Sequence, residues 1–438
     1  MSVDTTGLLP PEPSRGLAVW LGDDEDEQIS QLLCLGLWLS GRMEGDDEAA
    51  EQARLLGVPV VRTAGKTARS RPLPWLADRA LQRVEPRRHD GGEVVFVVDS
   101  DQLARTRVDS SGEGNEGSPA STADLETLWR NMTGWRSARS AVAFVSLALH
   151  GRRPAVRAMA AAVLTGVRTE NDDEVERVRT ELRDAEGYAA VFARMAGVHA
   201  SGQEVPDDLD AADESADGAD DADVHGLTDG ETDAAEEATA TSIVVHGTFA
   251  RLIPVPARWY APSAALPARI RRGCTPSLYR RGDYFRWTGA YRAVARAEGA
   301  ADLLEWCRLR GIAELDTVFA HSHGGSIVLE AIAQGLRVKL LVLLHTPVIP
   351  RPDSEWRDMR TRVGRIVELR TPLDWVVHLD RLFTNARNAM PPAMSAISRT
   401  LTPAVTGSLR FSHTRYVEDD VWKSLGLTND IAFERTYV

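Results

Sequence analysis

The sequence contains few cysteines and no long apolar run. Its three cysteines, Cys34, Cys274 and Cys307, are odd in number and far apart, so they predict neither a disulfide framework nor a metal site. The N-terminus has no basic segment followed by an apolar run, and no stretch reaches the roughly 18–20 uncharged apolar residues that a membrane span needs. We therefore expect a soluble protein of the cytoplasm with no integral membrane segment.

Basic residues are absent from residues 201–240, although this segment holds 15 of the 64 acidic residues. The segment also lacks aromatic residues, and so little apolar area cannot offset the entropy that ordering costs. It predicts an acidic, disordered linker, and an acidic interaction tail is the alternative. Outside it, 51 basic residues face 49 acidic ones, so charge argues neither for nor against nucleic acid, and no nucleic-acid partner is expected.

The length of 438 residues exceeds what one compact core usually serves, so more than one domain is expected. Residues 1–15 are polar and rich in proline, and they predict a disordered N-terminus. Residues 16–200 predict a small α/β and helical module of unknown role, for which a protein partner is an open option. Its expected helices are 27–40, 46–56, a segment near 75–84 and most of 123–198, and its expected strands, 57–62 and 94–101, favour a parallel sheet.

A strand, a sharp turn and a helix are expected in residues 315–331. Leu315–Phe319 predicts the strand, Ser326–Ala331 predicts the helix, and Ala320-His321-Ser322-His323-Gly324-Gly325 lies between them. Small residues two before and two after a serine let strand and helix approach closely around a strained nucleophile, as in the pattern G-x-S-x-G, here with Ala320 in place of its first glycine. Ser322 is the expected nucleophile, and a helix N-terminus capped by Ser322 is the alternative.

An apolar strand, Ser242–Val245, ends in the loop His246-Gly247-Thr248-Phe249. Together with the serine turn, this loop resembles the α/β-hydrolase fold, most closely its lipase and esterase branch, over residues 241–438. The resemblance implies an α/β-hydrolase domain in the C-terminal half of the chain. It also implies an oxyanion hole built from the backbone N–H groups of Thr248 and His323. No metal and no organic cofactor is expected.

The order of serine, acid and histidine in this fold directs the search downstream of Ser322. Asp374 follows the predicted strand Val363–Leu369 and is the expected acid, with Asp380, six residues further on, as its rival. Chain order and elimination make His413 the expected base. The histidines set aside are His323, His345 and His378.

The residues that contact the substrate are less well defined. His246, Phe249 and Trp287 are the candidates, with a core position as the alternative for Trp287. Residues 381–408 predict either a lid or an ordinary helix packed on the sheet. The expected function is a serine hydrolase that cleaves the carboxylic ester of a small-molecule acyl substrate through an acyl-enzyme. Thioesterase or peptidase activity stays open, and a catalytically silent hydrolase scaffold used for binding is the alternative.

Overall fold

A computed structural model describes ten segments of the chain. They are residues 24–43, 47–58, 84–88, 94–98, 128–132, 138–167, 173–201, 241–250, 258–401 and 412–438. The chain divides into two compact units: the first comprises Met1–Gly202 with His378–Asn385, and the second comprises Gln203–Val377 with Ala386–Val438. Residues 378–385, which the sequence placed in the C-terminal domain, thus belong with the N-terminal module. The expected linker lies almost entirely outside the described residues.

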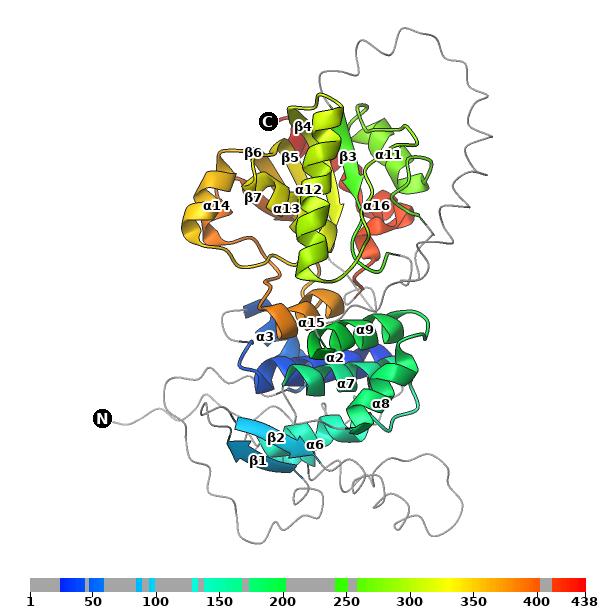
Figure 1. The fold of residues 1–438 in the computed structure, drawn as a ribbon, viewed down its shortest axis with the longest axis vertical. Helices are drawn as coiled ribbons and strands as arrows, with labels where there is room; N and C mark the ends of the chain where they lie inside the picture. Colours follow the sequence, from blue (N-terminus) through cyan, green and yellow to red (C-terminus); the bar gives the residue numbers. More distant parts are fainter. Residues whose placement is uncertain are drawn as a thin grey trace, which may run out of the picture. The chain divides into compact units, whose positions relative to one another are not determined.

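The described part of the first unit is mainly helical. Its helices are α2 (Glu25–Leu39), α3 (Asp47–Leu55), α6 (Ala138–Ala148), α7 (Pro154–Gly166), α8 (Asp173–Leu182) and α9 (Tyr188–Ser201). Helix α2 begins where the Asp24 side chain accepts a hydrogen bond from the Glu27 N–H at 3.1 Å, and α7 begins with a proline at its first position. Helix α7 packs against α2, α6, α8 and α9, which makes it the centre of this helical layer (Figure 1).

The expected parallel sheet in the N-terminal module is wrong for the strands that the structure describes. Strand β1 (Val84–Arg88) pairs antiparallel with β2 (Val94–Val98). Residues 89–93 connect them, and so short a link permits a hairpin but not the crossover that parallel neighbours need. Strand β1 also begins at Val84, where the sequence predicted the end of a helix. Most of that helix and most of the strand expected at 57–62 lie outside the described residues.

The second unit is built on a five-stranded parallel sheet. Its strands are β3 (Thr241–Val245), β4 (Glu314–His321), β5 (Arg337–Leu344), β6 (Val363–Leu369) and β7 (Ser398–Leu401), and they lie in that order. The central strands are buried on both faces, which explains why β5 reads as a nearly continuous apolar run. The unit is therefore of the mixed α/β class.

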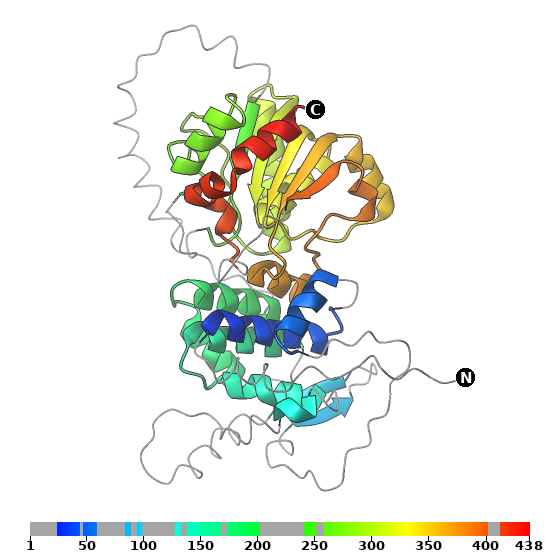
Figure 2. The same ribbon diagram turned by 180° about the vertical axis from the view of Figure 1, so that it is seen from behind.

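Helices cover both faces of this sheet. Helices α12 (Ala293–Leu309), α13 (His323–Ala333) and α14 (Asp353–Arg360) enclose one apolar core, whose largest side chains include Trp287, Trp306 and Trp356. Helices α11 (Ala265–Gly273), α16 (Asp419–Leu425) and α17 (Leu427–Arg435) enclose the other core around Phe319 and Trp422 (Figure 2, green and red helices). The sheet is thus the middle layer of three.

The five strands lie in chain order, but the connection from β3 to β4 does not run directly between them. After β3 the chain passes to the outer edge of that strand, where Leu278 makes a parallel bridge with Ser242, and α12 then leads back to β4 on the opposite side. In open α/β sheets, ligands bind beyond the carboxyl ends of the strands at such a switch point. The loop after β3 and the serine turn after β4 both lie there.

The described part of the segment between Asp374 and His413 packs as ordinary structure. After helix α15 (Trp375–Thr384), a short 3-10 turn (Pro392–Met394) leads into β7. Met394 is fully buried in the core beside α14, and the Met390 N–H donates to Glu368 at 2.9 Å. Up to residue 401 the chain therefore adds to the sheet layer and its core, whereas residues 402–411 lie outside the described residues.

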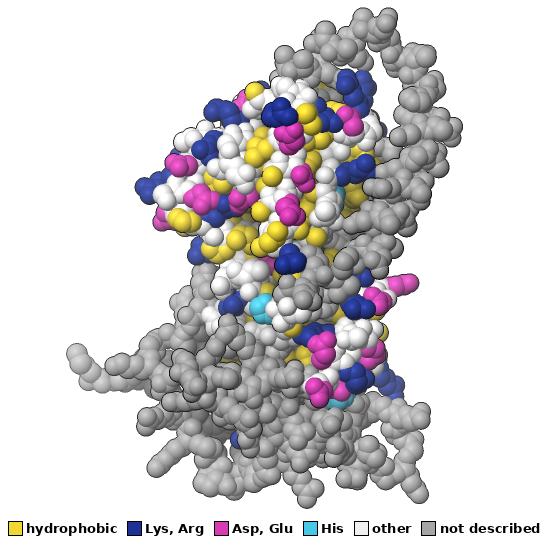
Figure 3. Space-filling model, in the orientation of Figure 1, with side chains coloured by type: hydrophobic (Ala, Val, Ile, Leu, Met, Phe, Trp, Pro, Cys, Tyr) yellow, Lys and Arg dark blue, Asp and Glu magenta, His cyan; other side chains and the backbone are white. Residues whose placement is uncertain are grey.

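The surface of the second unit carries both signs of charge. On the face shown in Figure 3, basic and acidic side chains are interspersed with apolar ones. Val294 and Leu309 of α12 are exposed apolar side chains. Among the described residues, no helix combines the length and the apolar character that crossing a membrane requires.

Candidate active site

Ser322 forms a strained turn between β4 and α13. Its backbone has φ 53° and ψ −134°, a conformation that residues other than glycine rarely adopt. A Cβ atom at Gly324 would overlap the carbonyl oxygens of Val245 and His246, so a glycine is required there for strand and helix to approach the neighbouring loop. The sequence prediction of a sharp strand–serine–helix turn is confirmed by this geometry.

The loop after β3 lies directly against Ser322. A Cβ atom added to Gly247 would lie 2.5 Å from the Ser322 Cβ. Thr248, the next residue, is buried, and His323 is the first residue of α13. Thr248 follows Gly247, which lies against Ser322, and His323 directly follows the serine, so both residues expected to supply oxyanion donors lie next to residues of this turn; their role in catalysis stays a prediction.

Aromatic side chains hold this loop in place. The Trp287 indole N–H donates to the His246 carbonyl oxygen at 2.8 Å. The His246 ring stacks on Tyr260, with ring centroids 4.3 Å apart, and on Trp287 at 5.8 Å. Trp287 is also part of the core beside α12, so in this structure it supports the loop. Substrate contacts by His246 and Trp287 stay predictions.

Phe249 and His323 form an aromatic group with Tyr291. The Phe249 and Tyr291 rings stack with centroids 6.0 Å apart, and the His323 ring meets Tyr291 edge to face at 5.4 Å. The His323 Nδ1 is 3.2 Å from the Ser326 hydroxyl within the first turn of α13. The His323 side chain thus has a packing role, as expected for a residue whose backbone was the predicted contributor.

Asp374 and His413, the predicted acid and base, are hydrogen bonded to each other. The His413 Nδ1 lies 2.7 and 2.9 Å from the two carboxylate oxygens of Asp374, and both side chains are fully buried. Asp374 also accepts hydrogen bonds from the Val376 and Val377 N–H groups, at 2.9 and 3.1 Å, so it caps α15 at the same time. Its rival, Asp380, lies within α15 and accepts from the Thr384 hydroxyl at 3.1 Å.

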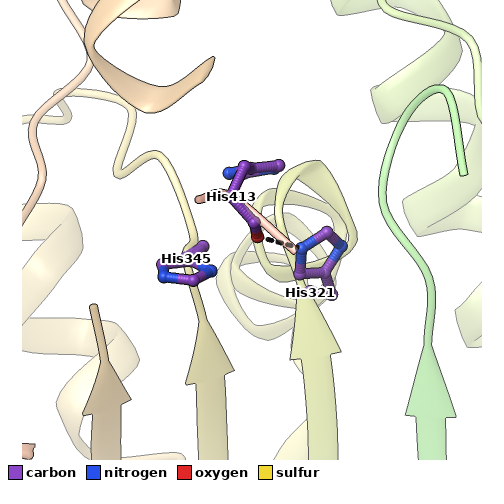
Figure 4. Close-up of side chains that lie close together, drawn as sticks. All are labelled: His321, His345 and His413. Carbon is purple, nitrogen blue, oxygen red and sulfur yellow. Dashed lines mark hydrogen bonds between the residues drawn. The ribbon is translucent and has the colours of Figure 1, made fainter. Parts of the chain in front are cut away.

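Ser322, the expected nucleophile, is not hydrogen bonded to this pair. Its hydroxyl is buried and makes no hydrogen bond to any described residue. The residue before Ser322 contacts His413 instead. The His321 Nε2–H donates a hydrogen bond to the His413 carbonyl oxygen, with 3.0 Å between the two atoms (Figure 4). Catalytic hydrogen bonds are often long or absent without substrate, so this arrangement is compatible with a Ser–His–Asp triad.

Two further histidines line the site, and sequence reasoning assigned neither of them. His321 and His345 lie with ring centroids 4.7 and 5.6 Å from that of His413 (Figure 4). Burial lowers the pKa of His345 to about 3 and lowers that of His321 well below its usual value, so both are neutral at pH 7. The sequence signal for these two histidines was their position at the ends of buried strands: His321 is the last residue of β4, and His345 directly follows β5.

The strained positions of this site follow one another across the sheet. Phe249, Ser322 and His345 have φ values of 52°, 53° and 49°, and they follow the adjacent strands β3, β4 and β5. Backbone strain of this kind costs about 1–3 kcal/mol per residue and is kept where surrounding structure enforces it, often at functional sites. The carboxyl edge of the sheet is therefore the strongest candidate for the functional centre.

The three imidazoles were also considered as a metal site. One ring nitrogen from each of His321, His345 and His413 lies within 4.8 Å of the others. Tetrahedral zinc with bonds of about 2.0–2.1 Å would bring its ligand nitrogens to roughly 3.4 Å from one another. His413 Nδ1 and His321 Nε2 are moreover engaged by Asp374 and by a carbonyl oxygen. As placed, the three rings do not fit a metal, and no metal-dependent step is derived.

Three comparisons with known proteins found no relative of this chain. No family model, no curated protein and no solved structure matches this chain. A function is therefore inferred from the residues of this site and from the sheet that positions them.

Proposed function

We propose that the second unit is an α/β-hydrolase-type serine hydrolase that cleaves the carboxylic ester of a small-molecule acyl substrate. The observation that carries the proposal is the buried Asp374–His413 pair together with the strained Ser322 turn, whose preceding residue, His321, donates to the His413 carbonyl oxygen. A histidine whose Nδ1–H donates to a carboxylate keeps its lone pair on Nε2, where it can accept a proton from a serine. A packing role alone requires none of these features.

The reaction proceeds in two halves. His413 Nε2 takes the proton of the Ser322 hydroxyl as the Oγ attacks the carbonyl carbon of the ester. The carbonyl oxygen becomes an oxyanion, which the N–H groups of Thr248 and His323 stabilise, each by about 3–4 kcal/mol of barrier. The intermediate collapses, the C–O bond to the alcohol breaks, and His413 returns the proton to the departing alkoxide. Water, deprotonated by His413, then attacks the acyl-enzyme and releases the carboxylic acid and Ser322.

The neutral state of His321 and His345 favours this catalytic cycle. His413 becomes an imidazolium in both halves, and Asp374 stabilises that charge from 2.7 Å. A second imidazolium at His345, whose Nδ1 is 3.9 Å from Asp374, would compete for the carboxylate and repel His413. The low pKa of His345 keeps that competitor uncharged throughout the working range of the base.

Active-site labelling tests the proposal. A fluorophosphonate probe should add one label to the wild-type chain, and intact-mass measurement should find none on Ser322→Ala. Ser395→Ala, which removes an exposed serine hydroxyl of the same unit, is the matched control and should label normally. Ester hydrolysis by Ser322→Ala above about 1% of wild type would contradict the assignment, because loss of a triad nucleophile normally costs more than about 10³-fold.

A binding scaffold without turnover is the second candidate, and one observation favours it. Ser322, Asp374 and His413 are all fully buried, and Ser322 is not hydrogen bonded to any described residue. A folded wild-type protein that neither takes the probe nor hydrolyses short-chain esters or thioesters would support this alternative. Labelling of wild type but not of Ser322→Ala would rule it out.

A further inference from the structure

The His321 side chain connects the serine turn to the segment that carries His413. His321 is the last residue of β4, directly before Ser322, and its side chain is buried. Its Nε2–H donates to the His413 carbonyl oxygen across 3.0 Å, as Figure 4 shows. The two residues are 92 positions apart in the chain, so one hydrogen bond joins the backbone of the proposed base to the neighbour of the proposed nucleophile.

This hydrogen bond holds His413 at a second point. Asp374, which follows β6, binds the His413 ring through Nδ1 at 2.7 Å. That contact alone lets the ring pivot about the carboxylate, because the ring also turns with its own backbone. The bond from His321, at the end of β4, restrains that backbone. The direction of the His413 Nε2 is therefore set from two strands of the same sheet, as a catalytic side chain requires.

The surroundings of His321 determine which of its ring nitrogens carries the proton. Its Nδ1 lies against the loop after β3, where a Cβ atom added to Gly247 would be 3.0 Å away. Among the described residues, Nδ1 has no hydrogen-bond partner, whereas Nε2 faces a carbonyl oxygen, which can only accept. A proton on Nδ1 would leave a buried donor without an acceptor and the carbonyl oxygen without its donor, so the Nε2–H tautomer is the stable one.

His321 keeps this proton while His413 changes its charge. The His321 ring packs edge to face against Trp259, with centroids 5.5 Å apart, and lies 4.7 Å from the His413 ring. Burial, together with the neighbouring His413, lowers the pKa of His321 well below its usual value. His321 therefore stays neutral when His413 becomes an imidazolium, and it adds no charge that would oppose that step.

We propose that His321 positions the general base: by donating from Nε2 to the His413 carbonyl oxygen, it directs the His413 Nε2 towards the Ser322 hydroxyl. This inference rests on the proposed hydrolase function. His321 is then a positioning residue, because it acts through the His413 backbone and not on the reacting atoms. A misplacement of about 1 Å in a catalytic group can lower the rate by about 100-fold, so loss of this one bond should be measurable in kcat.

Two amide side chains at position 321 test the hydrogen bond. In His321→Gln the amide nitrogen can take the place of Nε2 and donate to the same carbonyl oxygen, whereas the shorter side chain of His321→Asn brings it only to the place of Nδ1, beside Gly247. We expect His321→Asn to lower kcat for a simple ester by roughly 10–100-fold with little change in KM, and His321→Gln to stay within roughly threefold of wild type. The rate of fluorophosphonate labelling at Ser322 should follow the same order.

Loss of a buried hydrogen bond elsewhere in the same unit controls for general destabilisation. The buried Thr275 hydroxyl lies 2.9 Å from the Oγ of Ser242, the second residue of β3, at the amino-terminal edge of the sheet. Thr275→Val should lower the thermal midpoint and keep wild-type kcat. Should His321→Asn not fold, His321→Leu, which replaces the polar ring with apolar atoms, gives the same comparison with His321→Gln.

The tautomer can also be measured in the wild-type chain. Isotope-edited NMR of the histidine side chains should find His321 protonated on Nε2 alone, without titration between about pH 5 and pH 8. Its signals are identified as those that are missing in His321→Gln. A proton on Nδ1 would remove the donor and would overturn the proposal without any activity measurement.

The outcomes distinguish the two proposals. Wild type that neither labels at Ser322 nor hydrolyses esters overturns the hydrolase function itself. Wild type that labels, with a folded His321→Asn or His321→Leu that keeps wild-type kcat, overturns only the positioning role, and so does a His321→Gln whose kcat is as low as that of His321→Asn. A low kcat in His321→Asn that is largely restored in His321→Gln, with wild-type kcat in Thr275→Val, supports it.

Discussion

Asp374, which caps α15, and Asp380, within α15, are both buried but have different hydrogen-bond partners. Asp374 contacts His413 with both oxygens, whereas Asp380 accepts from Thr384 inside the helix. Asp374→Asn should keep the fold, since asparagine also caps helices, but should lower kcat by about 10⁴-fold because the amide favours the wrong imidazole tautomer. Asp380→Asn removes the same charge and should cost far less. Steady-state kinetics on both variants decide the matter, and a larger loss at Asp380 would reassign the acid.

His345 should make stability depend on pH. Burial depresses its pKa from 6.5 in a model peptide to about 3, so between these values the unfolded chain binds more protons than the folded one. The stability associated with neutral His345 is therefore fully present above pH 6.5 and is lost as pH falls towards 3. His345→Phe removes this titration, and the difference in urea midpoint between pH 5 and pH 7.5 should be smaller than in wild type. An unchanged difference would show that His345 does not titrate as its burial implies.

At the scale of elements, Trp287 links the core to the loop after β3. Trp287→Phe keeps an aromatic ring but removes the N–H that donates to the His246 carbonyl oxygen. We expect kcat to fall roughly tenfold, because the neighbouring Thr248 N–H is then less well aimed at the oxyanion. Trp306→Phe is the control: its N–H donates to the Asp283 carbonyl oxygen in the same core, away from the serine. Equal losses in both variants would mean that the effect is one of packing.

Local patterns predicted the serine turn and Asp374 because each follows a buried parallel strand, where sequence order fixes the edge of the sheet, whereas His413 was predicted by chain order and elimination. The strands of the second unit carry continuous apolar runs, so β3, β4 and β6 were all expected near their observed positions. The antiparallel pairing of β1 and β2 was missed because alternation along a strand does not specify its partner. The contacts of Leu382 with Gly36 and Gly166 join segments more than 200 residues apart, and no local pattern encodes them.

At the scale of the whole molecule, the stability of each of the two units can be followed by a signal of its own. Phe192 of α9 is fully buried in the first unit, and Phe192→Ala should destabilise that unit by about 3–5 kcal/mol. The temperature at which helical circular dichroism is lost should fall accordingly, whereas the temperature at which fluorophosphonate labelling of Ser322 disappears reports on the second unit.

Phe433→Ala, which truncates an exposed ring of α17, should leave both temperatures where they are in wild type. Labelling that survives in Phe192→Ala well above the loss of helical signal would show that the second unit keeps its active form without the first.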